Sequence, residues 1–297
     1  MPTGNPAPDF IDTSRPGPNL YSGSMLAVDA RSGHILWAKQ LVPHNTKDWD
    51  GGLGTSVATI SSVTTTSSSN NNVKSERVIV HGTKRGDAYA LDAINGNVIW
   101  KVPVGIQHNT EAQNTPNCTA AVWLGPAHGV EDYTANDNKI AYFAVSNMGY
   151  NFSSGGQVTP VSKAIANGIG NGTVTAIDIK TGKIKWVYPT EFPTRVSPAV
   201  TNGVVFSGHM TAIGTPYKYD SLTGWVIFAP LNPSGIIFAL DVDTGRKLWE
   251  FNVGAPLGIG GPSIGHGMLF VTTGFPNEIA INKGGDIVAF GLPADSQ

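Results

Sequence analysis

The stretch PHNTKDWD, residues 43–50, gathers side chains that could do chemistry. It places two carboxylates, Asp48 and Asp50, close to His44 and Lys47. A loop carboxylate can take a proton from a hydroxyl group, and it can also bind a hard cation. The same residues fit a solvated surface loop, because exposed aspartates are common in proteins. Choosing between these interpretations requires the elements that hold the stretch in place.

The rest of the chain is poor in charge. It has 297 residues, of which 13% are charged, and a net charge of −2, whereas about 25% is typical of a soluble domain. This length suffices for a sizeable core in one large all-β domain or two smaller ones. No basic stripe indicates nucleic-acid binding, and no apolar run approaches the ~20 residues of a membrane helix. The single cysteine, Cys118, rules out an intrachain disulfide, and we expect it to be a small packed residue.

A repeated pattern predicts the local structure. Each copy has an aspartate, a glycine four residues later and a tryptophan eight residues after the aspartate. Apolar residues alternate into the aspartate, whose carboxylate can accept N–H groups across a turn. The glycine supplies the positive φ of a tight hairpin, and the tryptophan follows on the returning strand, where it can pack between sheets. The four copies are MLAVDARSGHILWAKQL (25–41), AYALDAINGNVIWKVPV (88–104), VTAIDIKTGKIKWVYPT (174–190) and IFALDVDTGRKLWEFNV (237–253).

The spacing of the repeat predicts the fold. Successive aspartates are 63, 86 and 63 residues apart, and a four-stranded propeller blade needs about 40–50 residues. We therefore expect an all-β domain over residues 1–297, a β-propeller with about four to five antiparallel blades. The polar, low-complexity segment 61–72 (SSVTTTSSSNNN) predicts a surface loop. Residues 211–233 predict an irregular insertion, which either packs on the surface or covers a substrate entrance.

The repeat resembles the tryptophan-docking motif of the PQQ-dependent (quinoprotein) alcohol dehydrogenases, which bind pyrroloquinoline quinone (PQQ) and a metal ion in an eight-bladed propeller. Two stretches make the resemblance more specific. Residues 3–30 (TGNPAPDF…RPGPNLYSGSMLAVDA) are similar to a family segment whose first asparagine, here Asn5, is a metal ligand. PHNTKDWD resembles the family loop P-H-D-x-x-D-x-D, which implies that Asp48 is the general base and lies at the metal. Asp50 falls where a further carboxylate is a family hint for a lanthanide, and calcium remains the other choice. The alternative role for Asp50, as for His44, is to organise the loop.

Two weaker similarities concern the cofactor. HGTKRGDAYALD, residues 81–92, resembles the strand from which a lysine or arginine contacts the quinone, and the alignment places Lys84 there. Such a cation would stabilise negative charge on the quinone oxygens. Arg85 is the alternative, because neighbouring side chains on a strand point in opposite directions. Residues 129–135 (GVEDYTA) resemble a loop from which Glu131 could contact the cofactor, and Arg195 stands where relatives often have tryptophan.

The resemblance runs from Thr3 to Pro293 but corresponds only to the C-terminal half of the family pattern. The glutamate metal ligand, the vicinal disulfide and the tryptophan under the quinone, which the family's N-terminal blades supply, have no counterpart here. Three explanations stay open: a fragment, one half of a split enzyme with a second chain, or a shortened propeller that closes alone or as a dimer.

The resemblance implies a periplasmic or extracellular enzyme that oxidises an alcohol or aldehyde. Its electrons would pass to a cytochrome or other external acceptor, because the chain has no C-x-x-C-H site for attaching haem. The alternative from another class is a non-catalytic propeller that serves as a binding or assembly scaffold. Such a scaffold has no reason to keep the stretches around Asn5 and Asp48 together.

Overall fold

The structure is a computed structural model that describes most of the chain. The described residues are 1–8, 14–65, 71–108, 120–123, 129–147, 149–152, 158–160, 171–210, 215–219, 226–229, 234–257, 260–274 and 285–291. Cys118 lies outside them. Every paired strand within the described residues is antiparallel to its neighbours, so the all-β prediction is confirmed.

Three sheets have the four antiparallel strands of a propeller blade. In each sheet the four strands lie side by side in the order in which they occur along the chain. The last two of them carry the Asp-Gly-Trp repeat. The first consists of β3 (Thr55–Thr65), β4 (Asn71–Gly82), β5 (Asp87–Asp92) and β6 (Val98–Pro103). The second consists of β8 (Ala135–Asn136), β9 (Ile140–Asn147), β12 (Asn171–Asp178) and β13 (Ile184–Thr190), and the third of β14 (Val196–Thr201), β15 (Val204–Met210), β18 (Gly235–Asp241) and β19 (Lys247–Asn252).

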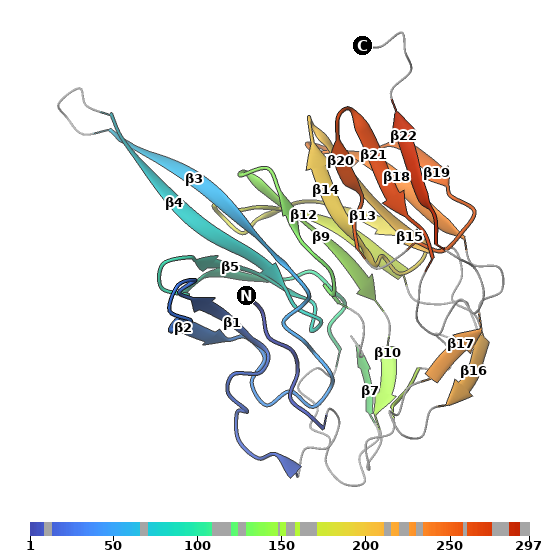
Figure 1. Ribbon diagram of the computed structural model, residues 1–297, viewed down its shortest axis with the longest axis horizontal. Helices are drawn as coiled ribbons and strands as arrows, with labels where there is room; N and C mark the ends of the chain where they lie inside the picture. Colours follow the sequence, from blue (N-terminus) through green and yellow to red (C-terminus); the bar gives the residue numbers. More distant parts are fainter. Residues whose placement is uncertain are drawn as a thin grey trace.

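Two smaller sheets lie at either end of this series. One is the pair β1 (Ser24–Val28) and β2 (Ile35–Gln40), and the other has β20 (Ser263–Gly265), β21 (Met268–Thr272) and β22 (Ile287–Gly291). In Figure 1 the sheets follow one another along an arc, from β1–β2 on the left to β20–β22 on the right. The described part of the chain therefore confirms the predicted series of four to five blades.

Two segments predicted as irregular contain strands. The β3–β4 ladder continues as far as Thr65, which pairs with Asn71, so both ends of 61–72 are strand rather than loop. Its valine and threonine residues favour extended backbone, which composition alone concealed. Within 211–233, β16 (Thr215–Tyr219) pairs with β17 (Val226–Ala229). A further small sheet is formed by β7 (Ala120–Trp123), β10 (Gly149–Phe152) and β11 (Val158–Pro160).

The repeat tryptophans join each blade to the next, as the sequence predicted. The indole N–H of Trp100 donates to the carbonyl of Ile179 in the following blade at 2.7 Å. Its ring covers Gly182, where φ is +71° and an added Cβ would lie 2.8 Å from the ring. Glycine is therefore required there for both backbone conformation and space. Trp37 and Trp186 make the corresponding bonds, to Ala93 at 3.2 Å and Val242 at 2.8 Å.

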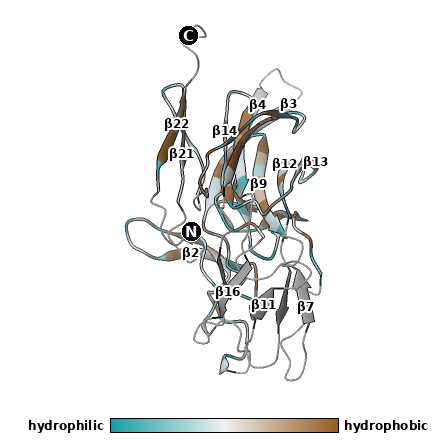
Figure 2. Ribbon diagram, turned by 90° about the vertical axis from the view of Figure 1, so that its right-hand side faces the viewer, coloured by the Kyte–Doolittle hydropathy of each residue, from teal (hydrophilic) through white to brown (hydrophobic). Residues whose placement is uncertain are grey.

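Apolar side chains fill the space between successive blades. Phe143 and Ile177 pack with residues of the preceding sheet, while Tyr142 and Val174 pack with the following one, as alternation along a strand requires. Figure 2 shows hydrophobic residues concentrated along the blade strands. This packing fixes the blades relative to one another and so positions the loops at their ends.

Candidate functional site

Backbone hydrogen bonds bring three loops together at one end of the blades. The Leu53 N–H donates to the Glu131 carbonyl at 2.8 Å, and the Lys84 N–H donates to the Asp50 carbonyl at 3.2 Å. Gly52, with φ +72°, allows the close approach, because a Cβ there would lie 2.5 Å from the Gly82 carbonyl oxygen. The loops that contain PHNTKDWD, Lys84 and Glu131 are thus held by their main chains.

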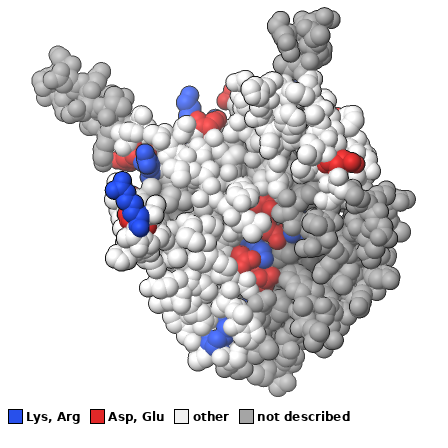
Figure 3. Space-filling view, in the orientation of Figure 1, with Lys and Arg blue, Asp and Glu red and all other residues white. Residues whose placement is uncertain are grey.

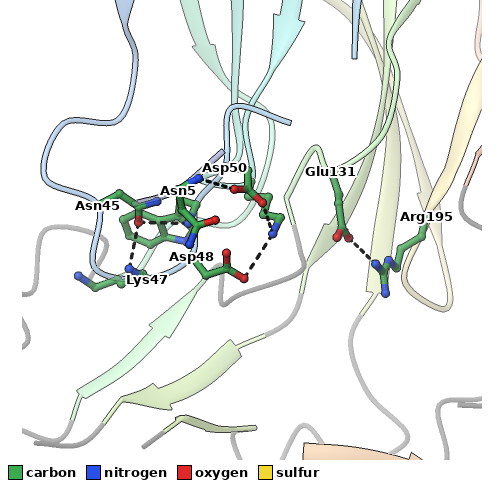
Figure 4. Close-up of polar contacts among 9 residues, drawn as sticks. Asn5, Asn45, Lys47, Asp48, Asp50, Glu131 and Arg195 are labelled. Atoms are coloured by element: carbon green, nitrogen blue, oxygen red, sulfur yellow. Dashed lines mark hydrogen bonds and ion pairs between the residues drawn. The ribbon is translucent and has the colours of Figure 1, made fainter. Parts of the chain in front are cut away.

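The N-terminal segment joins the same site. The Gly51 N–H donates to the Thr3 carbonyl at 3.2 Å, and the Asn5 N–H donates to Asp50 Oδ1 at 2.7 Å. Figure 4 shows Asn5 beside Asp50 and near Asp48. The two stretches that carried the resemblance therefore meet in space, although Asn5 and Asp50 are 45 residues apart in the chain.

A lysine bridges the two carboxylates of the stretch. The Lys84 Nζ lies 2.5 Å from Asp50 Oδ2 and 3.4 Å from Asp48 Oδ2, and all three side chains are largely buried. Burial by itself would lower the pKa of Lys84, but the charges of Asp48, Glu131 and Asp50 together raise it above its ordinary value. The lysine is therefore a permanent positive charge within this buried group.

The structure distinguishes Lys84 from its neighbour Arg85. The Arg85 side chain turns towards Asp87, 3.8 Å away, and lies over the ring of Trp49 with its guanidinium carbon 5.9 Å from the ring centroid. The Lys47 ammonium lies 5.1 Å from the same centroid. Of the two alternatives left by the sequence, Lys84 is the one that faces the carboxylates.

Asn45 organises the loop through its side-chain amide. Its side-chain Oδ1 accepts the N–H groups of Lys47 at 3.0 Å and Trp49 at 3.1 Å. Arg15 donates to the Asn45 carbonyl at 2.6 Å from the RPGPN segment. The tendency of asparagine to bond backbone N–H groups two residues ahead was the signal available. These bonds hold Asp48 at a φ of +57°, a conformation that is costly for a residue other than glycine.

Glu131 forms a second ion pair at the edge of the site. Its Oε2 lies 2.7 Å from Arg195 Nη2, and in Figure 4 this pair stands apart from the Asp48–Asp50 group. The next residue, Asp132, is buried, and its Oδ1 has no hydrogen-bond partner among the described residues. Burial and the charge of Glu131 raise the pKa of Asp132 to about 7, against the opposing charge of Arg195.

A buried histidine contacts the loop that follows Asp50. His81 is fully enclosed, with its Nδ1 3.3 Å from the Gly54 carbonyl. Burial lowers the pKa of His81 to about 4, so the imidazole is neutral at ordinary pH. Neither His81 nor Asp132 had a signal in the sequence, because their burial depends on packing between blades.

Some side chains of the site carry the kind of oxygen atoms that bind hard metal ions. Asn5, Asp48 and Asp50 offer amide and carboxylate oxygens, which hard cations prefer. Within the described residues, no three His, Cys, Asp or Glu side chains gather closely enough to hold a metal ion together. The residues fit part of the coordination shell of a hard cation, whose other positions would be left to further oxygen ligands. Charged groups are sparse on the face seen in Figure 3, and one mixed group of acidic and basic atoms lies near its middle.

Known proteins resemble this chain in sequence and in fold. Residues 1–117 match the family described as glucose/ethanol/alcohol dehydrogenase, beta-propeller domain, and residues 233–292 match outer membrane protein assembly factor BamB. The chain is 26% identical over 309 residues to methanol dehydrogenase (cytochrome c) subunit 1 of Paracoccus denitrificans, covering 90% of this chain and 42% of the relative.

Two solved structures show the same fold. The quinohemoprotein alcohol dehydrogenase of Comamonas testosteroni superimposes with a TM-score of 0.67 at 21% identity, over 92% of this chain and 42% of that one. A europium-containing methanol dehydrogenase gives a TM-score of 0.64 at 20% identity, over 92% of this chain and 48% of that one.

The fold is thus that of a PQQ-type β-propeller. The resemblance is confirmed, because the chain is similar to PQQ-dependent alcohol dehydrogenases in sequence and in fold. It spans 38% to 47% of the length of the first curated relatives that it matches. In the part of the chain that the structure describes, no helix has the length and apolar character needed to cross a membrane.

Proposed function

We propose that the chain forms the metal- and cofactor-binding part of a PQQ-dependent dehydrogenase that oxidises an alcohol or an aldehyde. One observation supports this above all others. Asn5, Asp48, Asp50 and Lys84 come from three stretches far apart in the sequence, each singled out by its resemblance to the family. A hydrogen bond and two ion pairs link them into one group. A structural role for each stretch separately would not require them to meet.

Each residue has a chemical role in this proposal. Bound PQQ would supply the two-electron acceptor for the substrate. Asp48 would take the proton of the substrate hydroxyl, and the Lys84 ammonium 3.4 Å away favours the charged carboxylate that can do so. Asn5, Asp48 and Asp50 would hold the metal ion. Lys84 would stabilise negative charge on the cofactor oxygens, with Glu131 as a further contact at the edge of the site.

The proposal also includes the identity of the metal ion, the electron acceptor, the source of the other blades and the location of the enzyme. The metal is calcium or a lanthanide, and Asp50 together with the europium of one structural neighbour favours the lanthanide. The electrons leave to a cytochrome or another external acceptor, which is consistent with the cytochrome c in the name of one relative. The other blades come from a further segment, a second chain or a second copy, and the enzyme works in the periplasm or outside the cell.

A second function remains in competition. The match of residues 233–292 to an assembly factor favours a propeller that serves as a non-catalytic scaffold. That match covers the end of the chain opposite the candidate site, whereas residues 1–117, which match the dehydrogenase domain, contain Asn5, Asp48 and Lys84. The distribution of the matches therefore supports the enzyme.

The test is a titration of the purified chain with PQQ in the presence of Ca²⁺ or La³⁺, followed by quinone absorbance and fluorescence. Metal-dependent binding is expected, together with alcohol-dependent reduction of a redox dye. In Asp48→Asn we expect dye reduction to fall by roughly 10²–10⁴-fold. The matched control, Asp243→Asn, changes an exposed turn residue of a distant blade. Absence of PQQ binding under all these conditions would reject the enzyme and favour the scaffold.

A further inference from the structure

We propose that Lys84 is an internal counter-cation that competes with the metal ion for Asp48 and Asp50, and so weakens cation binding more strongly as the cation's charge increases. The inference rests on the proposed metal site. It assigns to Lys84 a role in the cofactor-free protein that is separate from contact with the quinone.

The competition follows from the positions of the atoms. The Lys84 Nζ already lies 2.5 Å from Asp50 Oδ2 and 3.4 Å from Asp48 Oδ2. A hard cation such as calcium takes carboxylate oxygens at about 2.3–2.6 Å. A metal ion at that distance from the same oxygens would lie within a few ångströms of the ammonium, and the two positive charges would repel each other. A metal ion that binds both carboxylates is therefore favoured when the Lys84 ammonium moves away from Asp50.

The displacement involves only the side chain, because the backbone of Lys84 is held on both sides. Its N–H donates to the Asp50 carbonyl, and its own carbonyl is packed so tightly against Gly129 that a Cβ there would lie 2.1 Å from the oxygen. Gly129 has a φ of +81°, which also favours glycine. The ammonium, by contrast, sits on a flexible four-carbon stem. The charge of Glu131 acts on Lys84 as well, so the ammonium has an acidic neighbour on the other side of the site.

The carboxylates stay in position when the lysine moves. Asp50 Oδ1 accepts the Asn5 N–H at 2.7 Å, a bond independent of Lys84. The backbone around Asp48 is held by Asn45, which accepts the N–H groups of Lys47 and Trp49. Removing the ammonium should therefore leave the carboxylate oxygens in their positions and change mainly the local electrostatic charge.

The expected change in cation affinity follows from the positive charge of the Lys84 ammonium. A positive charge within about 4–6 Å of a carboxylate weakens its binding of a proton by about one to three powers of ten. The effect is larger for a divalent cation and larger again for a trivalent one, because Coulomb repulsion scales with charge. Lys84→Met should therefore bind Ca²⁺ at least about tenfold more tightly. Its preference for a trivalent over a divalent cation should also increase.

The experiment uses the PQQ-free 297-residue chain and Tb³⁺, whose luminescence a nearby tryptophan sensitises. Trp49 lies between the two carboxylates in sequence, so Trp49→Phe should abolish the sensitised signal and locate the ion. Ca²⁺ and La³⁺ affinities follow from competition with Tb³⁺ and from calorimetry. Arg85→Met is the matched control, since it removes a positive charge one residue away that faces Asp87 instead. Lys84→Arg keeps the charge and should keep the weak affinity.

The outcomes separate the two proposals. Tighter binding by Lys84→Met, with little change in Arg85→Met, supports the competition. If the wild-type protein binds the ions and Lys84→Met binds them equally or less tightly, Lys84 supports the site and the competition is rejected. If neither protein binds any of the ions, the proposed metal site itself is rejected. Should the methionine variant fail to fold by circular dichroism, Lys84→Gln provides the same comparison.

Discussion

Replacing Asp132 with asparagine should stabilise the protein at pH 8 and have little effect near pH 4. The folded-state pKa of Asp132 is about 7, against an ordinary value of 3.8, because the carboxyl group is buried next to Glu131. The folded protein therefore binds this proton more tightly than the unfolded chain, and stability is lost as the pH rises from about 4 to about 7. A difference of about three pKa units corresponds to roughly 4 kcal/mol. Asparagine carries no charge at any pH and avoids this loss, so we expect a gain of about 2–4 kcal/mol at pH 8.

The assay is urea unfolding followed by tryptophan fluorescence, near pH 4 and at pH 8, for the wild type and the variant. The slope of the free energy of unfolding against urea should stay constant, so that the midpoints report stability. Asp243→Asn, which changes an exposed carboxylate, is the control and should differ from the wild type by the same small amount at both pH values. An equal difference between wild type and Asp132→Asn at both pH values would refute the argument from a buried proton.

Three further predictions, which use four variants, test other parts of the structure. His81 has a pKa of about 4 in the folded state against 6.5 ordinarily. The free energy of unfolding of the wild type should therefore fall by up to about 3 kcal/mol as the pH falls from about 6.5 to about 4. His81→Gln should remove this pH dependence in urea titrations. Trp100→Ala removes the inter-blade ring and its bond to Ile179, and should cost about 3–5 kcal/mol by calorimetry. Trp249→Ala, at a more exposed ring, should cost less, and equal losses would contradict the docking argument. Asn45→Ala should weaken Tb³⁺ binding severalfold with little change in Tm, and unchanged affinity would show that the loop needs no such support.

The blades could be predicted because the information for them is local. An aspartate, a glycine and a tryptophan at fixed spacing encode a hairpin, its turn and the ring that joins it to the next blade, as Trp100 and Gly182 show. The motifs around Asn5 and Asp48 also marked two stretches that the structure brings into contact. Amino-acid composition was a poor guide for the segment 61–72. Its polar residues suggested a loop, whereas its ends pair as strands.

The sequence by itself therefore determined the repeating β architecture and the stretches that form the candidate site. Only the tertiary structure decided how those side chains pair. It directed Lys84 rather than Arg85 to the carboxylates, joined Glu131 to Arg195, and buried Asp132. These outcomes depend on loops brought together from distant parts of the chain, such as Lys84 and Asp48, which are 36 residues apart. Charge pairing and burial arise from this approach, and no pattern of neighbouring residues specifies them.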